Sequence, residues 1–279
     1  MNRTLGRERR EYFFAAHILI PAWFFPADLL KSSQMIDIHC HILPEVDDGP
    51  ATWKVAQEMC RMAAADGIQH IVATPHANDR YHYDRPYLVG LRDHLQGLVG
   101  PAPRLGLGCD FHMSYENLQD VMVNPARYLI EGGQYLLVEL SNFSIPAQIE
   151  QSYTRLRQIG VTPIITHPER NPILQRTPQR VLQWVELGCA VQVTASAFTG
   201  RWGKAAARMA EWLLKREALH VLATDAHNAS TRPPSLSAAR AIVADLCGQD
   251  VARALVEDNP RAVVTGQPMP YFPEPVRKD

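Results

Sequence analysis

The sequence has no excess of charge of either sign and no paired cysteine motif. Its 279 residues include 28 Lys and Arg and 29 Asp and Glu, which give a formal net charge of −1. This balance argues against a general nucleic-acid binder or a protein of anionic membrane surfaces, but it leaves room for a local basic pocket. The five cysteines are scattered, and none belongs to a CxxC pair. We therefore expect reduced, mostly buried thiols and a cytoplasmic location.

The chain also lacks an uninterrupted apolar run near its start. A basic segment, MNRTLGRERR, precedes an apolar stretch that superficially resembles a secretory signal. His17, Pro21 and Pro26 interrupt this stretch, which is also too short to cross a membrane. We expect residues 1–34 to be a loosely ordered extension, or translation upstream of the true start. Residues 35–279 are expected to form one domain without stable membrane insertion.

From residue 35 onward, apolar runs typical of strands alternate with helical patterns, and no repeat, low-complexity tract or linker interrupts them. The predicted strands span residues 35–42, 68–74, 104–111, 134–140, 161–166, 190–194 and 218–224. The predicted helices span residues 51–66, 87–99, 146–159, 178–188, 203–216 and 235–247. Gly67, Gly160 and Gly188 follow helical segments closely, as C-terminal caps do. Seven strands separated by helices predict a parallel sheet with right-handed crossovers.

Histidine and carboxylate residues stand at the exits of most of these strands. The segments are IDIHCHILP (36–44), VATPHAND (72–79), VELS (138–141), IITHPER (164–170) and LATDAHN (222–228), with a weaker sixth, LGLGCDF (105–111). An open doubly wound sheet gathers its ligands at one switch point. A barrel collects them from the ends of all its strands. The pattern therefore favours a closed or nearly closed α/β barrel.

The first of these segments carries the clearest metal-binding signal. Alternation along a strand places Asp37, His39 and His41 on one face, so two imidazoles can bind one ion. This strand is too apolar to be an exposed edge. Asp47 and Asp48 follow in the VDDGP turn, where one of them could instead cap a helix.

The other segments add histidines and carboxylates of uneven value as evidence. Glu139 is the most telling, because a carboxylate that ends a buried strand is costly without a cation partner, whereas His76 alone would usually be a solvated loop residue. The candidate metal ligands are His39, His41, Asp48, His76, Asp110, Glu139, His167, Asp225 and His227. This set is too large for one tetrahedral zinc and predicts two or three ions, with ligation that suits Mn²⁺, Fe or Zn²⁺. Clustered ions lower the pKa of bound water and hold the oxygens of a transferring phosphoryl group.

Two arginines close to these segments are candidates for phosphate binding. Arg170 and Arg232 could each hold a phosphate through two parallel hydrogen bonds. Cys247 and Arg253 fit a C-x5-R spacing in CGQDVAR, but Cys247 follows a helical run and Asp250 would repel phosphate. We interpret that match as a coincidence.

The histidines outside these segments are predicted to have packing or surface roles. His70 and His220 precede or begin apolar strands, where a buried histidine is ordinary. His112 is the exception, because it shares the strand face of Asp110 and is expected to line the pocket.

The motifs DIHCHILPEVDDGP, ATPH, VELS, THPER and TDAHN, in this order, resemble those of a known family. It comprises the bacterial manganese-dependent protein-tyrosine phosphatases of capsule and exopolysaccharide loci, in the polymerase-and-histidinol-phosphatase (PHP) superfamily. The resemblance runs from Met35 to about Gly266. It implies a distorted (β/α)7 barrel, Mn²⁺ as the ion, and hydrolysis of phosphotyrosine on proteins. It also implies a partner, an autophosphorylating tyrosine kinase of polysaccharide export.

The resemblance further implies how three ions share the nine ligands. One ion would take His39, His41, Asp225 and Asp110, a second would take Asp110, Glu139 and His167, and the third would take Asp48, His76 and His227. Arg170 and Arg232 would occupy the phosphate-binding positions. The family carries glutamate where this chain has Asp110, so a bridging role for the shorter side chain requires the ions or the backbone to shift inward.

Three other functions compete with this reading. A histidinol-phosphate phosphatase of the same superfamily would share the metal ligands and differ in its substrate pocket. An amidohydrolase would typically place a carboxylated lysine where the fourth strand ends in Glu139, and no lysine lies between Lys54 and Lys204. A low-turnover, metal-stabilised regulator or scaffold is a third possibility, although the intact ligand set argues against a decayed enzyme.

Overall fold

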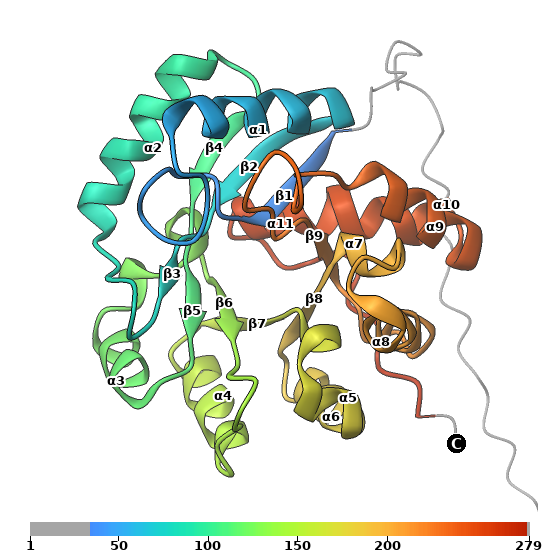
Figure 1. Ribbon diagram of the computed structural model, residues 1–279. Coiled ribbons are helices and arrows are strands. Elements are labelled where there is room, and N and C mark those ends of the chain that lie inside the picture. Colours follow the sequence, from blue (N-terminus) through green and yellow to red (C-terminus); the bar gives the residue numbers. More distant parts are fainter. Residues whose placement is uncertain (1–33, 278–279) are drawn as a thin grey trace, which may run out of the picture. The chain divides into compact units, whose positions relative to one another are not determined.

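The computed structural model describes residues 34–277, so almost all of the predicted extension lies outside the described residues (Figure 1). The strands are β1 (Met35–Cys40), β2 (Ile68–Ala73), β3 (His76–Ala77), β4 (Arg104–Leu107), β5 (Asp110–His112), β6 (Tyr135–Glu139), β7 (Thr162–Thr166), β8 (Ala190–Thr194) and β9 (Val221–Ala223). They form two parallel sheets, in the orders β1-β2-β4 and β3-β5-β6-β7-β8-β9.

The two sheets together make one ring of seven strand positions. Only two residues separate β2 from β3, and only two separate β4 from β5, so each pair continues one strand from the first sheet into the second. The ring closes where β1 meets the end of β9. There the amide of His41 donates to the carbonyl of Ala226 over 2.8 Å, and that of Asp225 donates to the carbonyl of His39 over 2.8 Å. The predicted distorted (β/α)7 barrel is confirmed.

The prediction of a single strand over residues 104–111 is wrong, because the strand is interrupted at Gly108. The Gly108 amide still donates to the carbonyl of Ala73 over 2.8 Å. Its carbonyl, however, accepts a hydrogen bond of 2.8 Å from the Tyr83 hydroxyl instead of continuing the ladder. A side chain at this position would come within 2.9 Å of Ile130. As a result Asp110 begins a new strand, in register with His76.

The helices alternate with the strands and lie around them (Figure 1). Those that match predicted helices are α1 (Trp53–Asp66), α2 (Arg85–Val99), α4 (Ile149–Gln158), α6 (Gln179–Glu186), α8 (Gly203–Lys215) and α9 (Ser237–Cys247). The sequence did not predict α3 (Tyr115–Val123), α5 (Pro172–Arg176), α7 (Ala195–Phe198), α10 (Gln249–Arg253) and α11 (Asn259–Val264). Three turns of 3-10 helix are η1 (Pro125–Arg127), η2 (Ile130–Gly132) and η3 (Pro168–Arg170), and η4 (Ala254–Asp258) is a π-helix.

Local chemistry sets several of these helix ends. Thr52 begins α1 by accepting a hydrogen bond from the Val55 amide, and Ser114 begins α3 by accepting one from the Asn117 amide. Gly67 ends α1 with φ +95°, a conformation that glycine adopts without strain. Among the described helices, none is long and apolar enough to cross a membrane.

Buried apolar side chains pack around and between the strands. The larger cluster joins helices to strands, and a smaller one joins residues of several strands, including Ile36, Ile38, Val72, Leu137 and Ile164. All five of these side chains are at most 5% exposed. Polar residues that follow these strands are therefore carried on a densely packed support.

Candidate metal centre

The nine predicted ligands come together at the carboxyl ends of the strands. They lie on or just after β1, β3, β5, β6, β7 and β9, except for one aspartate in the loop between β1 and α1. They are His39, His41, Asp48, His76, Asp110, Glu139, His167, Asp225 and His227. The placement is the one that a barrel enzyme uses to build its site.

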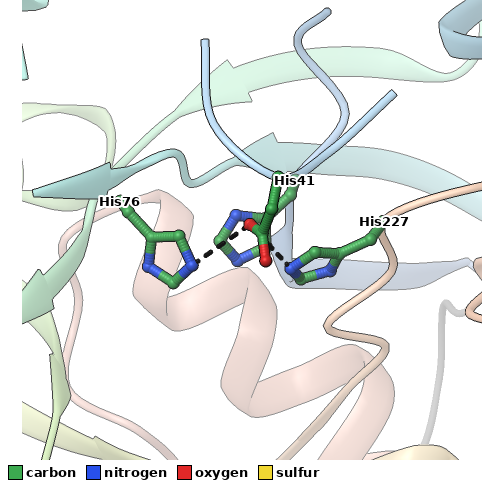
Figure 2. Close-up of side chains that lie close together, drawn as sticks. His41, His76 and His227 are labelled. Atoms are coloured by element: carbon green, nitrogen blue, oxygen red, sulfur yellow. Dashed lines mark ion pairs between the residues drawn. The ribbon is translucent and has the colours of Figure 1, made fainter. Parts of the chain in front are cut away.

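One group of potential ligands is centred on Asp48. His41, His76 and His227 point toward one another from three separate segments (Figure 2). The Asp48 Oδ1 atom lies 3.4 Å from His76 Nε2 and 3.3 Å from His227 Nε2. The His41 and His227 ring centroids are 4.0 Å apart. The four side chains can therefore share one cation.

Two further groups share Asp110. Its Oδ2 atom lies 3.5 Å from His39 Nε2, 3.9 Å from His41 Nε2 and 3.2 Å from His76 Nδ1. The same His76 nitrogen is 3.6 Å from Glu139 Oε2. Asp110 thus belongs both to a group with His39 and His41 and to a group with His76 and Glu139. A carboxylate with this position can contact two cations, although its neighbours differ in part from those implied by the resemblance.

His167 and Asp225 lie beside these groups in unusual backbone conformations. His167 Nε2 is 3.8 Å from Glu139 Oε1, and Asp225 Oδ1 is 3.6 Å from His39 Nε2. Both residues have positive φ, +32° for His167 and +49° for Asp225. Such conformations cost roughly 1–3 kcal/mol each outside glycine and concentrate at functional sites. The His167 amide is held by the carbonyl of Gln192 at 2.8 Å.

The site contains buried polar atoms that the described residues leave unpaired. His39 Nε2, His41 Nε2, His76 Nδ1 and both carboxylate oxygens of Asp110 have no hydrogen-bond partner within the described part of the chain. An unpaired buried polar group costs about 1–3 kcal/mol, and more when it is charged. Imidazole nitrogens and carboxylate oxygens aimed at one another are satisfied together by a divalent cation. The donor set therefore fits metal ions.

The electrostatics of the site follow from its buried carboxylates. Burial alone would lower the pKa of His39, but the charges of Asp110 and Asp225 raise it to about 9. Burial opposes charge on His76 as well, yet the carboxylates of Asp110 and Asp48 beside the ring raise its pKa to about 11. His39 and His76 in turn hold the pKa of Asp110 well below its usual value against the effect of burial. The carboxylates thus create strong attraction for positive charge.

Asp47 and Gln192 orient His41 and His39. The sequence did not indicate this role for either residue. Asp47 Oδ2 accepts a hydrogen bond of 2.7 Å from His41 Nδ1, and Gln192 Oε1 accepts one of 3.0 Å from His39 Nδ1. In each ring the Nε2 atom is left facing the site, the usual arrangement of metal-binding histidines. Asp47 was visible in VDDGP, but Gln192 lies on β8, a strand without any ligand signal.

The two predicted phosphate-binding arginines meet at Asp225. Arg232 Nη2 donates to Asp225 Oδ2 over 2.6 Å, and Arg170 forms a close ion pair with the same oxygen. The other carboxylate oxygen of Asp225 faces His39, His41 and His227. Asp225 therefore separates the histidine groups from a pair of guanidinium groups.

An open cavity adjoins the centre at Glu139. It has a volume of about 360 Å³, and its lining includes His112, Glu139, Arg80 and Phe143. His112 Nδ1 lies 3.8 Å from Glu139 Oε2, which places His112 in the pocket wall as predicted. Phe143 is 95% exposed. Substrate can therefore approach the ligand cluster from this side.

Comparison with known proteins identifies the family. The sequence model described as "Capsular polysaccharide synthesis, CpsB/CapC" matches residues 35–265. The chain belongs to the CpsB/CapC family. It is 31% identical to the tyrosine-protein phosphatase YwqE of Bacillus subtilis over 208 residues, which cover 71% of this chain and 79% of YwqE. It is 28% identical to the tyrosine-protein phosphatase CpsB of Streptococcus pneumoniae over 243 residues, covering 84% and 99%.

A solved structure supports the same assignment. It comes from a study of YwqE and CpsB described as metal-dependent tyrosine phosphatases, and it superimposes with a TM-score of 0.81 at 30% identity. The match covers 88% of this chain and all of the other. The resemblance predicted from the motifs is confirmed at the level of the CpsB/CapC family.

The structure also bears on the alternative cysteine mechanism. Cys247 ends α9 and Arg253 ends α10, with only Gly248 between the two helices. Arg253 is engaged by Asp258 at 3.1 Å and Asp250 at 3.5 Å. Partial burial raises the pKa of the Cys247 thiol, which disfavours the reactive thiolate. In this CpsB/CapC protein the C-x5-R spacing does not form a phosphate-binding loop.

Proposed function

We propose that this protein hydrolyses phosphotyrosine on proteins with the help of two or three bound divalent cations. The proposal rests on one observation: three histidine–carboxylate groups that share ligands lie next to a pair of arginines. The named phosphatases YwqE and CpsB, with which the chain shares its family, support the same activity.

The side chains divide the work of phosphoryl transfer. Bound cations would lower the pKa of the attacking water and neutralise charge on the phosphoryl oxygens. Arg170 and Arg232 would donate hydrogen bonds to the phosphate and hold it for in-line displacement. Asp225 keeps both guanidinium groups at the border of the site. Asp47 and Gln192 bind Nδ1 of His41 and His39, so that Nε2 of each ring faces the site.

The ligand types narrow the choice of cation. Imidazole nitrogens and carboxylate oxygens together suit Mn²⁺, Fe and Zn²⁺, whereas a site for Mg²⁺ or Ca²⁺ would be richer in oxygen. We assign Mn²⁺ as the working ion, because the family that the motifs resemble is manganese-dependent and the mixed ligand set accepts this ion. Measuring which ion restores activity to the stripped protein tests this choice.

The cellular setting is inferred from the family and from the cysteines. The substrate we assign is an autophosphorylating tyrosine kinase of polysaccharide export, in keeping with the capsule-synthesis description of the family. All five cysteines are free and four are buried, which supports a cytoplasmic location. The ligands come from both the first and the last strand, which supports one catalytic domain over residues 35–279.

The main experiment compares substrates on the metal-stripped protein. We expect no hydrolysis without metal, and hydrolysis of a phosphotyrosine peptide well above that of histidinol phosphate once Mn²⁺ is restored. Preference for histidinol phosphate would replace the proposal with a small-molecule phosphatase. Failure to hydrolyse either compound would favour the scaffold alternative.

A variant experiment tests the site itself. Replacing His41 and Asp225 together by alanine should abolish metal-dependent hydrolysis of the peptide while the circular dichroism spectrum stays that of the wild type. The control is His82→Ala, because His82 is exposed and lies outside the predicted ligand set. Unchanged activity in the double variant would refute the proposed centre.

A further inference from the structure

The two arginines at the border of the site share one aromatic partner. Arg170 ends η3 after β7, and Arg232 follows β9, so they come from distant parts of the chain. The guanidinium carbon of Arg170 lies 3.8 Å from the ring centroid of Trp202, and that of Arg232 lies 5.3 Å from it. Both distances are within the roughly 6 Å reach of cation–π attraction.

Trp202 is itself fixed by a hydrogen bond and by packing. Its Nε1 atom donates to the Ser196 hydroxyl over 2.9 Å, and Ser196 belongs to α7, directly after β8. Trp202 immediately precedes α8 and packs against the larger apolar cluster. The indole therefore presents a stationary face to both guanidinium groups.

The arginines need such a support because their charges repel each other. Both turn toward one oxygen of Asp225, and each side chain would otherwise have several rotamers available. An aromatic face attracts the two cations without neutralising them, so their hydrogen-bonding capacity remains available. We propose that Trp202 is a positioning residue that holds Arg170 and Arg232 as a pair facing the phosphoryl group. This role rests on the proposed phosphatase function.

The chain offers a matched control on the neighbouring helix. Trp212 in α8 also contacts an arginine, with the guanidinium carbon of Arg216 5.2 Å from its ring centroid, and it also packs against the larger apolar cluster. Among the ring and cation–π contacts of the described residues, Trp212 appears only with Arg216, which is not one of the nine predicted ligands. Trp212→Leu therefore removes an equivalent indole from outside the site.

The experiment measures inorganic phosphate binding by calorimetry on the Mn²⁺-loaded full chain, together with KM and kcat for a phosphotyrosine peptide. We expect Trp202→Leu to weaken phosphate binding and raise KM by about five- to tenfold, which corresponds to about 1–1.4 kcal/mol. Metal content should stay unchanged. Trp202→Phe keeps an aromatic face and should stay within about threefold of the wild type, as should Trp212→Leu.

The outcomes separate this inference from the function on which it rests. Normal phosphate binding by Trp202→Leu, or equal losses in Trp202→Leu and Trp212→Leu that follow their melting temperatures, would reduce Trp202 to a packing residue. The wild type could instead bind phosphate without hydrolysing the peptide, which would refute the proposed function. Loss of phosphate binding in Trp202→Leu would then still support the positioning role of Trp202.

Discussion

Two buried histidines at opposite ends of the barrel, His39 and His220, differ in what surrounds them. At the carboxyl end, His39 is fully buried and its unpaired Nε2 faces Asp110 and Asp225. At the amino end, His220 precedes β9, is equally buried and also has an unpaired Nε2, while its Nδ1 accepts a hydrogen bond of 3.1 Å from the Val191 amide. Among the described residues, no carboxylate forms an ion pair with the His220 ring. The first ring has its pKa raised to about 9, and the second has it lowered to about 3.

This difference shows that burial by itself does not make a ligand. Burial lowers the pKa of both rings, and at His39 the charges of Asp110 and Asp225, followed by the hydrogen bond to Gln192, reverse the effect. Next to His220 lies the ring of Phe272, with centroids 4.2 Å apart, so the imidazole stays neutral and packs as an apolar group. The carboxylates beside His39 favour charge on that ring, whereas burial disfavours charge on His220.

The largest expected effect comes from removing charge at the carboxyl end. Asp110→Asn keeps the shape of the side chain but removes the charge shared by two ligand groups. Loss of several kcal/mol of charge stabilisation lowers kcat/KM on the order of a thousandfold. Steady-state kinetics across a Mn²⁺ titration measures this.

The matched variant for this comparison is Asp110→Glu. Because the resemblance places glutamate at this position, we expect it to keep kcat/KM within about tenfold of the wild type. Near-normal activity of Asp110→Asn would show that Asp110 does not carry the ions.

A smaller effect is expected from the groups that orient the histidines. Asp47→Asn weakens the hold on His41 and should lower Mn²⁺ affinity by roughly 10–100-fold, with activity recovering at higher Mn²⁺ concentration. Equilibrium dialysis measures the affinity, and the exposed Asp93→Asn serves as the control. If Mn²⁺ binds Asp47→Asn as tightly as it binds the wild type, the 2.7 Å contact has no role in the centre.

At the amino end we expect an effect on stability alone. The folded pKa of His220, about 3, lies below the unfolded value of 6.5, so the unfolded chain binds the proton first. The contribution of neutral His220 to stability is complete above pH 6.5. It decreases by at most about 1.4 kcal/mol per pH unit as the pH falls toward 3.

His220→Gln should flatten this dependence, because glutamine cannot take up the proton. Urea unfolding between pH 7 and pH 4.5 measures the slope, with the exposed His82→Gln as the reference. Phosphatase activity near neutral pH should not change. An identical slope in His220→Gln and the wild type would contradict the assignment of a neutral buried ring.

The smallest effect is predicted for the thiol at the end of α9. Cys247→Ser should leave kcat/KM within about twofold, because neither Cys247 nor Arg253 contacts the described metal centre. A large loss of activity would revive the thiol mechanism.

The sequence predicted which side chains lie together at the strand ends better than it predicted the path of the chain between them. His39 and His41 could be paired because alternation along a strand depends only on local geometry. The break at Gly108 could not be foreseen, because it depends on the Tyr83 hydroxyl from a distant loop. Helix α3 was missed although Ser114 caps it, since a helix of nine residues gives only a short periodic signal.

The supporting residues were the least predictable part of the site. Gln192 and Trp202 have no motif that marks them, and their roles arise only once β8 and α8 are brought beside β1 and β7. Which ligands share a cation likewise depends on register between strands, as with His76 opposite Asp110. Such contacts between distant segments produce no periodic pattern in the sequence.

The pairing of His76 with Asp110 also constrains how this chain can evolve. Asp110 faces the centre because two residues, Gly108 and Cys109, lie between β4 and β5. Insertion or deletion of one residue there would turn Asp110 to the opposite face of the sheet, because side chains alternate with a period of two. Substitution of Asp110 by another carboxylate residue is therefore compatible with the centre, whereas a change in the length of the connection between β4 and β5 is not.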